Sequence, residues 1–179
     1  MPLICGIDPG LQGAIAAITM EGQLVSLQDT PVISVEKGKS TKNQYQPSQM
    51  FSILSVIKES SRGAFLQSDP TVRIVAIENV HAMPGQGVTS MFSMGYGLGL
   101  WIMGCAALKF PIEYVEPGVW KRAMSCGKDK NLSIQRALQL FPSATPQLKR
   151  VKDHGRAESL LIAEFLRRKL TGQAFPALK

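Results

Sequence analysis

Apolar runs of strand length open the chain and are separated by short turns. Residues 3–7 lead into the turn Asp8-Pro9-Gly10, and residues 13–19 and 22–27 follow as two further runs. Connections this short cannot hold a parallel crossover, which needs a dozen or more residues. We therefore predict three antiparallel strands in a β-meander, with a hairpin turn at Glu21-Gly22.

The apolar pattern stops at residues 36–47, which are polar, basic and poor in apolar anchors. We predict an exposed loop there, either a solvated connector or a segment that contacts DNA. After this loop the apolar positions have helical spacing along one face, at Met50, Phe51, Ile53, Leu54 and Ile57. A β-branched run at residues 72–78 then ends in Glu78, as the first run ends in Asp8.

The second half of the chain alternates helix and strand patterns. An apolar helix precedes Leu108, and a short strand is predicted at residues 112–115. Further helices are predicted near residues 119–124, 132–140 and 156–170, with a proline-broken loop at 141–151 and a flexible tail at 171–179. The five predicted strands form a mixed sheet, its first three strands antiparallel, flanked by helices in an α/β fold. A chain of 179 residues has the length of one domain, residues 1–179.

Residues 83–108 carry no charged side chain and end in a strongly apolar run. That run is shorter than the roughly 20 residues that a bilayer core demands, and Gly95, Gly97, Gly99 and Gly104 interrupt the stretch. We predict a buried central helix whose glycines allow close packing, and no membrane span.

Composition adds a partner class to this fold. The formal net charge of +7 and the sequence pI near 9.5 suit a polyanion such as nucleic acid. The three cysteines have no spacing typical of a zinc site and indicate a reducing setting. Since the N-terminus carries no recognisable targeting signal, we expect a cytoplasmic or nucleoid protein of bacterial or phage origin, or an organellar one if a transit peptide was removed.

Two carboxylates, Asp8 and Glu78, each end a predicted buried strand. A carboxylate there is costly unless it is paired, hydrogen-bonded or bound to a cation. In α/β sheets, sites form at strand ends, so neighbouring strands bring such groups together. The alternative for Asp8 is a turn-forming role before Pro-Gly.

A third polar cluster opens the last predicted helix, with Asp153, His154 and Glu158. His154 and Glu158 share a helix face at i and i+4, whereas Asp153 joins Glu158 only from the entering turn. The structural alternative is an Asp153 that caps the helix. Taken with Asp8 and Glu78, the carboxylates suit Mg²⁺, which prefers oxygen ligands and shares its shell with phosphate.

Four stretches resemble the Holliday junction resolvases related to RuvC. They are Gly6-Ile7-Asp8-Pro9-Gly10, Ile77-Glu78, residues 84–87 together with 95–101, and residues 147–158. The stretch from Lys152 to Glu158 is most similar to the monokaryotic chloroplast 1 type of resolvase and its bacterial and phage relatives. The opening Gly-Ile-Asp pattern is less specific, because actin-like ATPases and sugar kinases share it.

The resemblance implies a ribonuclease H-like homodimer that nicks two opposed strands of a four-way junction symmetrically. It implies two Mg²⁺ or Mn²⁺ ions per active site, with the catalytic ligands Asp8, Glu78, Asp153 and Glu158, and leaves open whether Asp153 or His154 is the last ligand. Lys121 matches a catalytic position near the scissile phosphate, although a plain surface lysine is the alternative. The implied DNA contacts are Met83, Pro84, Gly85, Gln86, Gly87, Lys121, Arg122, Lys149, Arg150 and Lys152.

Three other functions remain open from the sequence. A two-lobed ATPase or kinase needs about two domains, and the chain lacks a P-loop, so no nucleotide cofactor is expected. A DNA-binding module without catalysis fits the charge but leaves the carboxylates unexplained. A ribonuclease H or transposase relative acting on another substrate keeps the same chemistry. For the expected dimer, residues 91–101 are a candidate surface.

Overall fold

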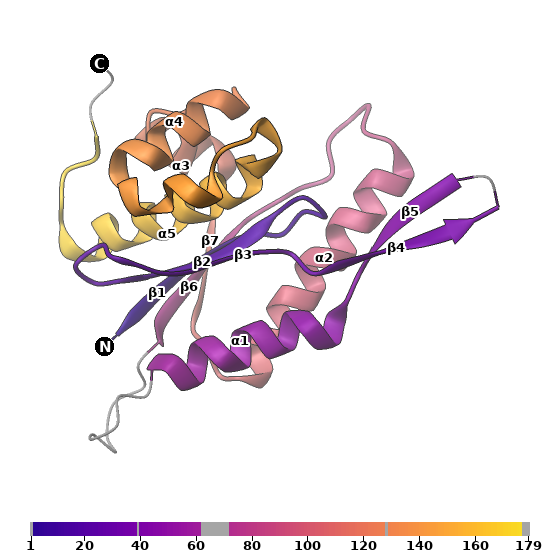
Figure 1. The fold of residues 1–179 in the computed structure, drawn as a ribbon, viewed down its shortest axis with the longest axis horizontal. Coiled ribbons are helices and arrows are strands. Elements are labelled where there is room, and N and C mark those ends of the chain that lie inside the picture. Colours follow the sequence, from indigo (N-terminus) through magenta and orange to yellow (C-terminus); the bar gives the residue numbers. More distant parts are fainter. Residues whose placement is uncertain (1, 39, 62–71, 128, 177–179) are drawn as a thin grey trace.

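The computed structural model describes residues 2–38, 40–61, 72–127 and 129–176 (Figure 1). Its five-stranded sheet has the order β3-β2-β1-β6-β7. The strands are β1 (Leu3–Asp8), β2 (Ala14–Thr19), β3 (Leu24–Asp29), β6 (Val72–Glu78) and β7 (Ile112–Val115). The first three are antiparallel, while β6 runs parallel to both β1 and β7. The predicted mixed sheet is confirmed.

Helices cover both faces of this sheet (Figure 1). One face carries α3 (Pro117–Ala123), α4 (Lys130–Leu140) and α5 (His154–Thr171), and the other carries α1 (Pro47–Ser61) and α2 (Val88–Ala107). Ile4 therefore belongs to one apolar cluster, and Cys5 and Ile7 to the other. Because β1 is covered on both faces, it lacks the polar alternation of a half-exposed strand.

Helix α5 lies directly against β1. A Cβ added at Gly6 would stand 2.2 Å from the Ser159 carbonyl oxygen, so only glycine permits this approach. The helix ends at Gly172, whose φ of 68° places it in the left-handed region that favours glycine. This close packing fixes the early turns of α5 beside the end of β1.

The prediction that α2 is a buried central helix is wrong. Only one face of α2 is buried, at Gly97, Trp101, Gly104 and Cys105, and the opposite face is exposed. Close packing is confirmed for two glycines, since a Cβ at Gly97 or Gly104 would lie 2.3 Å or 2.7 Å from a neighbouring side chain. A Cβ at Gly95 or Gly99 would meet no atom within 4 Å. Within the described ranges, no helix has the length and hydropathy needed to cross a bilayer.

The exposed loop predicted at residues 36–47 is also wrong in its backbone. Strands β4 (Val32–Lys37) and β5 (Ser40–Tyr45) pair there in a separate antiparallel sheet, which projects past α2 in Figure 1. Residues 41–44 are exposed, so the prediction of exposure holds. No apolar alternation marks these strands, because their side chains before Tyr45, where the structure describes them, are exposed or only partly buried.

The region between α4 and α5 contains two short 3₁₀ helices, η1 (Pro142–Gln147) and η2 (Val151–Asp153), where a loop was predicted. Ala144 and Leu148 are buried and tie this region to the core. The predicted tail also differs, because Thr171 belongs to α5 and Phe175 stacks on Phe165 with ring centroids 5.4 Å apart. Residues 177–179 of that prediction lie outside the described residues.

Candidate active site

The ends of two parallel strands place Asp8 and Glu78 at the same edge of the sheet. Strands β1 and β6 are neighbours, and their register pairs Ile7 with Ile77, one residue before each carboxylate. Helix α5 packs against both strands and brings Glu158 to the same edge, since the negative charge of Glu158 is one cause of the raised pKa of Asp8. Three of the four predicted carboxylates therefore meet at one place.

Glu158 is held by a cation and a hydroxyl group. The Lys121 ammonium donates to both of its carboxylate oxygens at 3.2 Å. The buried Ser133 hydroxyl donates to Oε1 at 3.3 Å. Burial by itself lowers the pKa of Lys121, but the negative charges of Glu158 and Glu78 outweigh it and raise the pKa above its ordinary value. Lys121 is therefore cationic at neutral pH, and it is more than a plain surface lysine.

Glu78 is buried and accepts a hydrogen bond from an indole. Trp120 Nε1 donates to its Oε1 at 3.0 Å, and the Trp120 ring is fully buried. Burial raises the pKa of Glu78, while the Lys121 charge and the Trp120 hydrogen bond act in the opposite direction. The indole thus fixes the orientation of a carboxylate whose ionised form is disfavoured by its surroundings.

Asp8 is the most strongly perturbed carboxylate of the site. Burial, followed by the negative charges of Glu78 and Glu158, raises its pKa to about 7. The Gly10 N–H donates to its Oδ1 at 3.2 Å and opposes the rise, as does the more distant Lys121. Three carboxylates beside one ammonium carry excess negative charge, and a bound cation would relieve it.

Asp153 lies apart from this cluster. Its carboxylate accepts hydrogen bonds from the Arg150 guanidinium at 2.7 Å and from the Arg150 backbone N–H at 2.8 Å. These side-chain hydrogen bonds are the main reason that its pKa is lowered. The ring of His154 is engaged locally, with Nδ1 3.2 Å from the Val151 carbonyl oxygen. Asp153 stands at the N-cap position of α5, but its side chain makes no capping hydrogen bond to that helix and instead completes a capping box with Arg150 at η2, so the predicted cap of the last helix is not what the structure shows.

The carboxylate oxygens of this cluster suit a hard divalent cation, although they are not spaced to surround an ion by themselves. Among the described residues, no three His, Cys, Asp or Glu side chains are close enough to hold an ion by themselves. Mg²⁺, however, keeps several waters and is bound through one or two carboxylates together with substrate phosphates. Asp8 and Glu78 supply that number, and Glu158 is close enough to affect the Asp8 pKa.

Sequence reasoning missed Trp120 and Ser133. Trp120 stands beside Lys121, which the family pattern singled out, so its neighbourhood carried a signal. Ser133 carries none, because a serine in a predicted helix is an ordinary surface residue. Both contacts join residues far apart in the chain, with separations of 42 and 25 positions.

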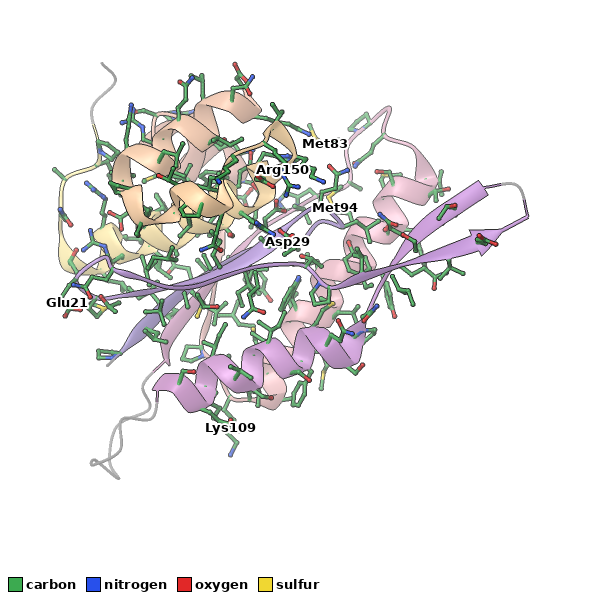
Figure 2. All side chains as sticks on the ribbon, viewed as in Figure 1. Glu21, Asp29, Met83, Met94, Lys109 and Arg150 are labelled. Atoms are coloured by element: carbon green, nitrogen blue, oxygen red, sulfur yellow. The ribbon has the colours of Figure 1, made fainter. Side chains whose placement is uncertain are left out.

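The predicted DNA-contacting loop between β6 and α2 is exposed. Met83 has 68% of its surface accessible, and Figure 2 shows its side chain projecting from this segment. Gly85 has a φ of 81°, which turns the backbone back towards α2. Pro84 and Gly87 are exposed, and the partly exposed Gln86 accepts from the Met83 N–H at 3.4 Å.

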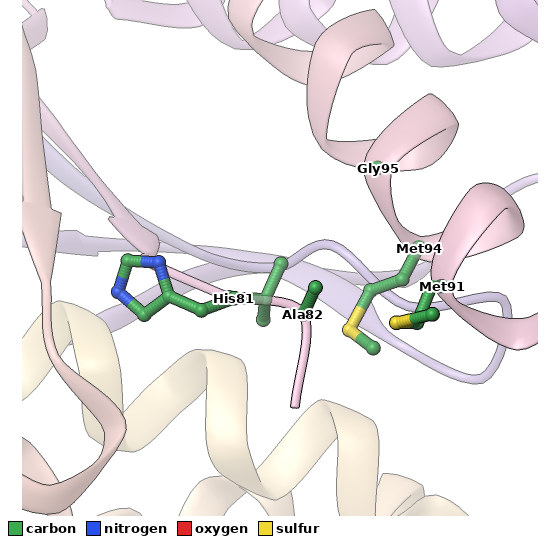
Figure 3. Close-up of a pocket in the computed structure, with 6 residues that line it drawn as sticks. His81, Ala82, Met91, Met94 and Gly95 are labelled. Carbon is green, nitrogen blue, oxygen red and sulfur yellow. The ribbon is translucent and has the colours of Figure 1, made fainter. Parts of the chain in front are cut away.

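The base of this loop is tethered to the start of α3. Asn79 Nδ2 donates to Glu116 at 2.6 Å, and His81 Nε2 lies 3.3 Å from the same carboxylate. A hollow between the loop and α2 is lined by Val80, His81, Ala82, Met91, Met94 and Gly95 (Figure 3). The remaining basic residues predicted to contact DNA, Arg122, Lys149, Arg150 and Lys152, are all exposed.

Comparisons with known proteins agree on one class. No protein-family model matches the chain. The chain is similar to the chloroplastic Holliday junction resolvase MOC1 of Chlamydomonas reinhardtii, with 28% identity over 150 residues. The match covers 78% of this chain but 17% of that protein, so the chain spans about a sixth of its relative's length.

Solved structures show the fold. Thermus thermophilus RuvC in complex with a Holliday junction substrate matches with a TM-score of 0.62 and 13% identity, covering 99% of this chain and all of that one. The yeast mitochondrial Holliday junction resolvase Ydc2 matches with a TM-score of 0.53 and 15% identity, over 95% of this chain and 79% of that chain. The chain has the ribonuclease H-like fold of RuvC, and the resemblance found in the motifs is confirmed.

Proposed function

We propose that the chain is a metal-dependent endonuclease that resolves four-way DNA junctions by hydrolysing phosphodiester bonds on two opposed strands. One observation carries this proposal: on a RuvC fold, Asp8, Glu78 and Glu158 meet at one sheet edge beside the Lys121 ammonium. The similarity to the chloroplastic resolvase supports the substrate class.

Asp8, Glu78 and Glu158 are the residues of this cluster that would hold divalent ions. Two Mg²⁺ or Mn²⁺ ions, when bound, would supply a hydroxide nucleophile at neutral pH and stabilise the leaving 3′ oxygen. Trp120 keeps the Glu78 carboxylate in one orientation, and Lys121 and Ser133 do so for Glu158. These contacts preorganise the ligands before DNA arrives.

Lys121 has a second role in the proposed reaction. Its ammonium lies at the carboxylate cluster and is partly exposed, so a phosphate oxygen has access to it. A fixed positive charge at this place would offset the negative charge that develops on the scissile phosphate. As phosphate approaches, the contact with Glu158 would be shared with the substrate.

The DNA-binding surface would combine the loop at residues 83–87 with exposed basic side chains. Met83 at the tip of that loop is apolar and exposed, which suits insertion between bases at the centre of a junction. Arg122, Lys149, Arg150 and Lys152 would contact phosphates.

A second copy of the chain is the partner we propose for the exposed face of α2. That face is uncharged and carries Phe92 and Met103, which are 76% and 65% exposed. Gly95 and Gly99 lie on the same face with open space above them, so another helix has room to approach closely. A two-fold dimer would present two active sites to a nearly two-fold junction, as symmetric nicking requires.

The first test compares the wild type with Asp8→Asn on a labelled four-way junction and a matched linear duplex, each with Mg²⁺ and with EDTA. We expect paired nicks on the junction alone, lost with EDTA and in Asp8→Asn. Binding without cleavage would favour a DNA-binding module. An RNA–DNA hybrid tested alongside would be the preferred substrate of a ribonuclease H relative.

A further inference from the structure

Tyr45 connects the β4–β5 hairpin to the turn that carries Asp8. It is the last residue of β5, where the hairpin joins the body of the protein, and it is buried, with 7% of its surface accessible. Its hydroxyl donates to the Pro9 carbonyl oxygen at 3.3 Å, across 36 positions of sequence. The acceptor belongs to the Pro9–Gly10 peptide, and the N–H of that peptide donates to Asp8 Oδ1 at 3.2 Å, so this hydrogen bond acts on a group that contacts a proposed metal ligand.

The same side chain packs into α2. A Cβ at Gly97 would stand 2.3 Å from the Tyr45 ring and hydroxyl and 2.7 Å from the Pro9 carbonyl oxygen. Tyr96 meets the Tyr45 ring edge-on, with centroids 5.9 Å apart. Only a residue without a side chain at position 97 allows the helix, the tyrosine and the Asp8 turn to meet.

The Asp8 turn is held from the other side as well. A Cβ at Gly155 of α5 would lie 2.0 Å from the Gln12 carbonyl oxygen, and one at Gly13 would lie 2.1 Å from the Asp8 carbonyl oxygen. The turn is thus packed between α5, which carries Glu158, and the Tyr45–Gly97 contact.

The electrostatics agree with this proximity. Burial raises the pKa of Tyr45, a hydrogen bond with Ser93 of α2 opposes the rise, and the negative charge of Asp8 adds to it. The hydroxyl therefore stays protonated at neutral pH and remains a donor to Pro9.

We propose that Tyr45 is a positioning residue, which sets the place of Asp8 by joining the Asp8-Pro9-Gly10 turn to α2. This inference rests on the proposed function, since it assigns Tyr45 to the reaction of that site. Tyr45 touches no reacting atom, and its effect passes through the Pro9–Gly10 peptide, whose N–H donates to the Asp8 carboxylate. The position of α2, and with it the loop at residues 83–87, would in this way be coupled to the geometry of the proposed metal site.

The test uses Tyr45→Phe, which removes the hydroxyl and keeps the ring, with Tyr114→Phe as the matched control. Tyr114 is 48% exposed on β7 and takes no part in the site. Three quantities are measured on the full chain: amide hydrogen exchange at Gly10 and Gly13, Mn²⁺ affinity from the metal-induced rise in Tm, and kcat and KM on a four-way junction.

We expect Tyr45→Phe to accelerate exchange at Gly10 and Gly13 about fivefold, to weaken Mn²⁺ binding about fivefold, and to lower kcat about fivefold, while KM changes less than about twofold. A neutral hydrogen bond contributes an effect of this order. Tyr114→Phe should match the wild type in all three. A Gly97→Ala variant, which displaces Tyr45, should change the same quantities in the same direction.

Wild-type exchange and Mn²⁺ affinity in Tyr45→Phe, with only Tm lowered, would overturn the proposal, and so would a rise in KM with kcat unchanged. Failure of the proposed function is a separate result. If the wild type leaves junctions uncut, exchange at Gly10 and Mn²⁺ binding still decide the role of Tyr45.

Discussion

At the scale of single residues, the surroundings of Asp8 disfavour the ionised form of its carboxyl group. Its pKa of about 7 in the metal-free protein lies above the ordinary value of 3.8, because burial and two neighbouring carboxylates oppose ionisation. The folded state therefore binds a proton over a pH range in which the unfolded chain has released it. Folding stability then falls as pH rises from about 4 to about 7.

Replacing Asp8 should remove this penalty. We expect Asp8→Asn to be more stable than the wild type in EDTA at pH 8, by about 2 kcal/mol after allowance for solvent screening, and the advantage should shrink towards pH 4. Thermal denaturation of both proteins at pH 5 and pH 8 measures it. Adding Mg²⁺ at pH 8 should stabilise the wild type and leave Asp8→Asn unchanged. Equal Tm differences at both pH values would contradict the raised pKa.

The hydrogen bond from Trp120 to Glu78 can be tested by substitution. Trp120→Phe removes the Nε1–H that donates to Glu78 at 3.0 Å, and leaves a buried carboxylate with one partner fewer. We expect kcat to fall about tenfold, with a loss of stability of about 2 kcal/mol from the smaller ring and the missing hydrogen bond. Steady-state cleavage below the Tm of the variant separates the two effects. Unchanged kcat would show that the indole serves packing alone.

At the scale of elements, the start of α5 decides which residue completes the proposed ligand set. Asp153 is paired with Arg150, while His154 lies at the first residue of α5. For Asp153 to bind an ion, the Arg150 guanidinium must release it, and a DNA phosphate is a competing partner for that guanidinium. The ligand role of Asp153 therefore stays a prediction, coupled to DNA binding through Arg150.

Asp153→Asn and His154→Ala form a matched pair for this question. Asparagine keeps an acceptor for the Arg150 backbone N–H but loses the charge that binds a cation. We expect Asp153→Asn to reduce cleavage at least a hundredfold with little change in Tm, and His154→Ala to reduce it less than about tenfold. The reverse order, measured with Mg²⁺ and with Mn²⁺, would assign the ligand role to His154.

Some helices and strands could be predicted from the sequence pattern and others could not. The central strands and α5 were predictable, because burial on both faces leaves a continuous apolar run in β1 and β6, and burial of α5 leaves apolar positions at helical spacing. The β4–β5 hairpin was not, since its described side chains before Tyr45 are exposed or only partly buried and its pairing is made by backbone groups that every residue shares. For α2, an uncharged sequence predicted burial, whereas half of its surface is exposed.

At the scale of the whole molecule, the exposed face of α2 predicts self-association. Phe92→Glu places a charge on that face, and we expect it to convert a wild-type dimer to a monomer in sedimentation experiments and to change paired nicks to single nicks. Val56→Glu is the control, because Val56 is a 53% exposed apolar residue on a different helix, α1. A monomeric wild type, or a dimer that Phe92→Glu leaves intact, would refute this interface.

Local patterns were enough to predict the class of fold, the two strand-end carboxylates and the similarity to RuvC-related resolvases. Strand and helix patterns are local, so burial of each segment is visible in its own residues. Which polar groups contact one another depends on the packing of distant segments. Three hydrogen bonds join residues far apart in the sequence: Lys121 to Glu158 over 37 positions, Trp120 to Glu78 over 42, and Tyr45 to Pro9 over 36. Contacts of this range depend on how the helices lie on the sheet, and no local periodicity encodes them.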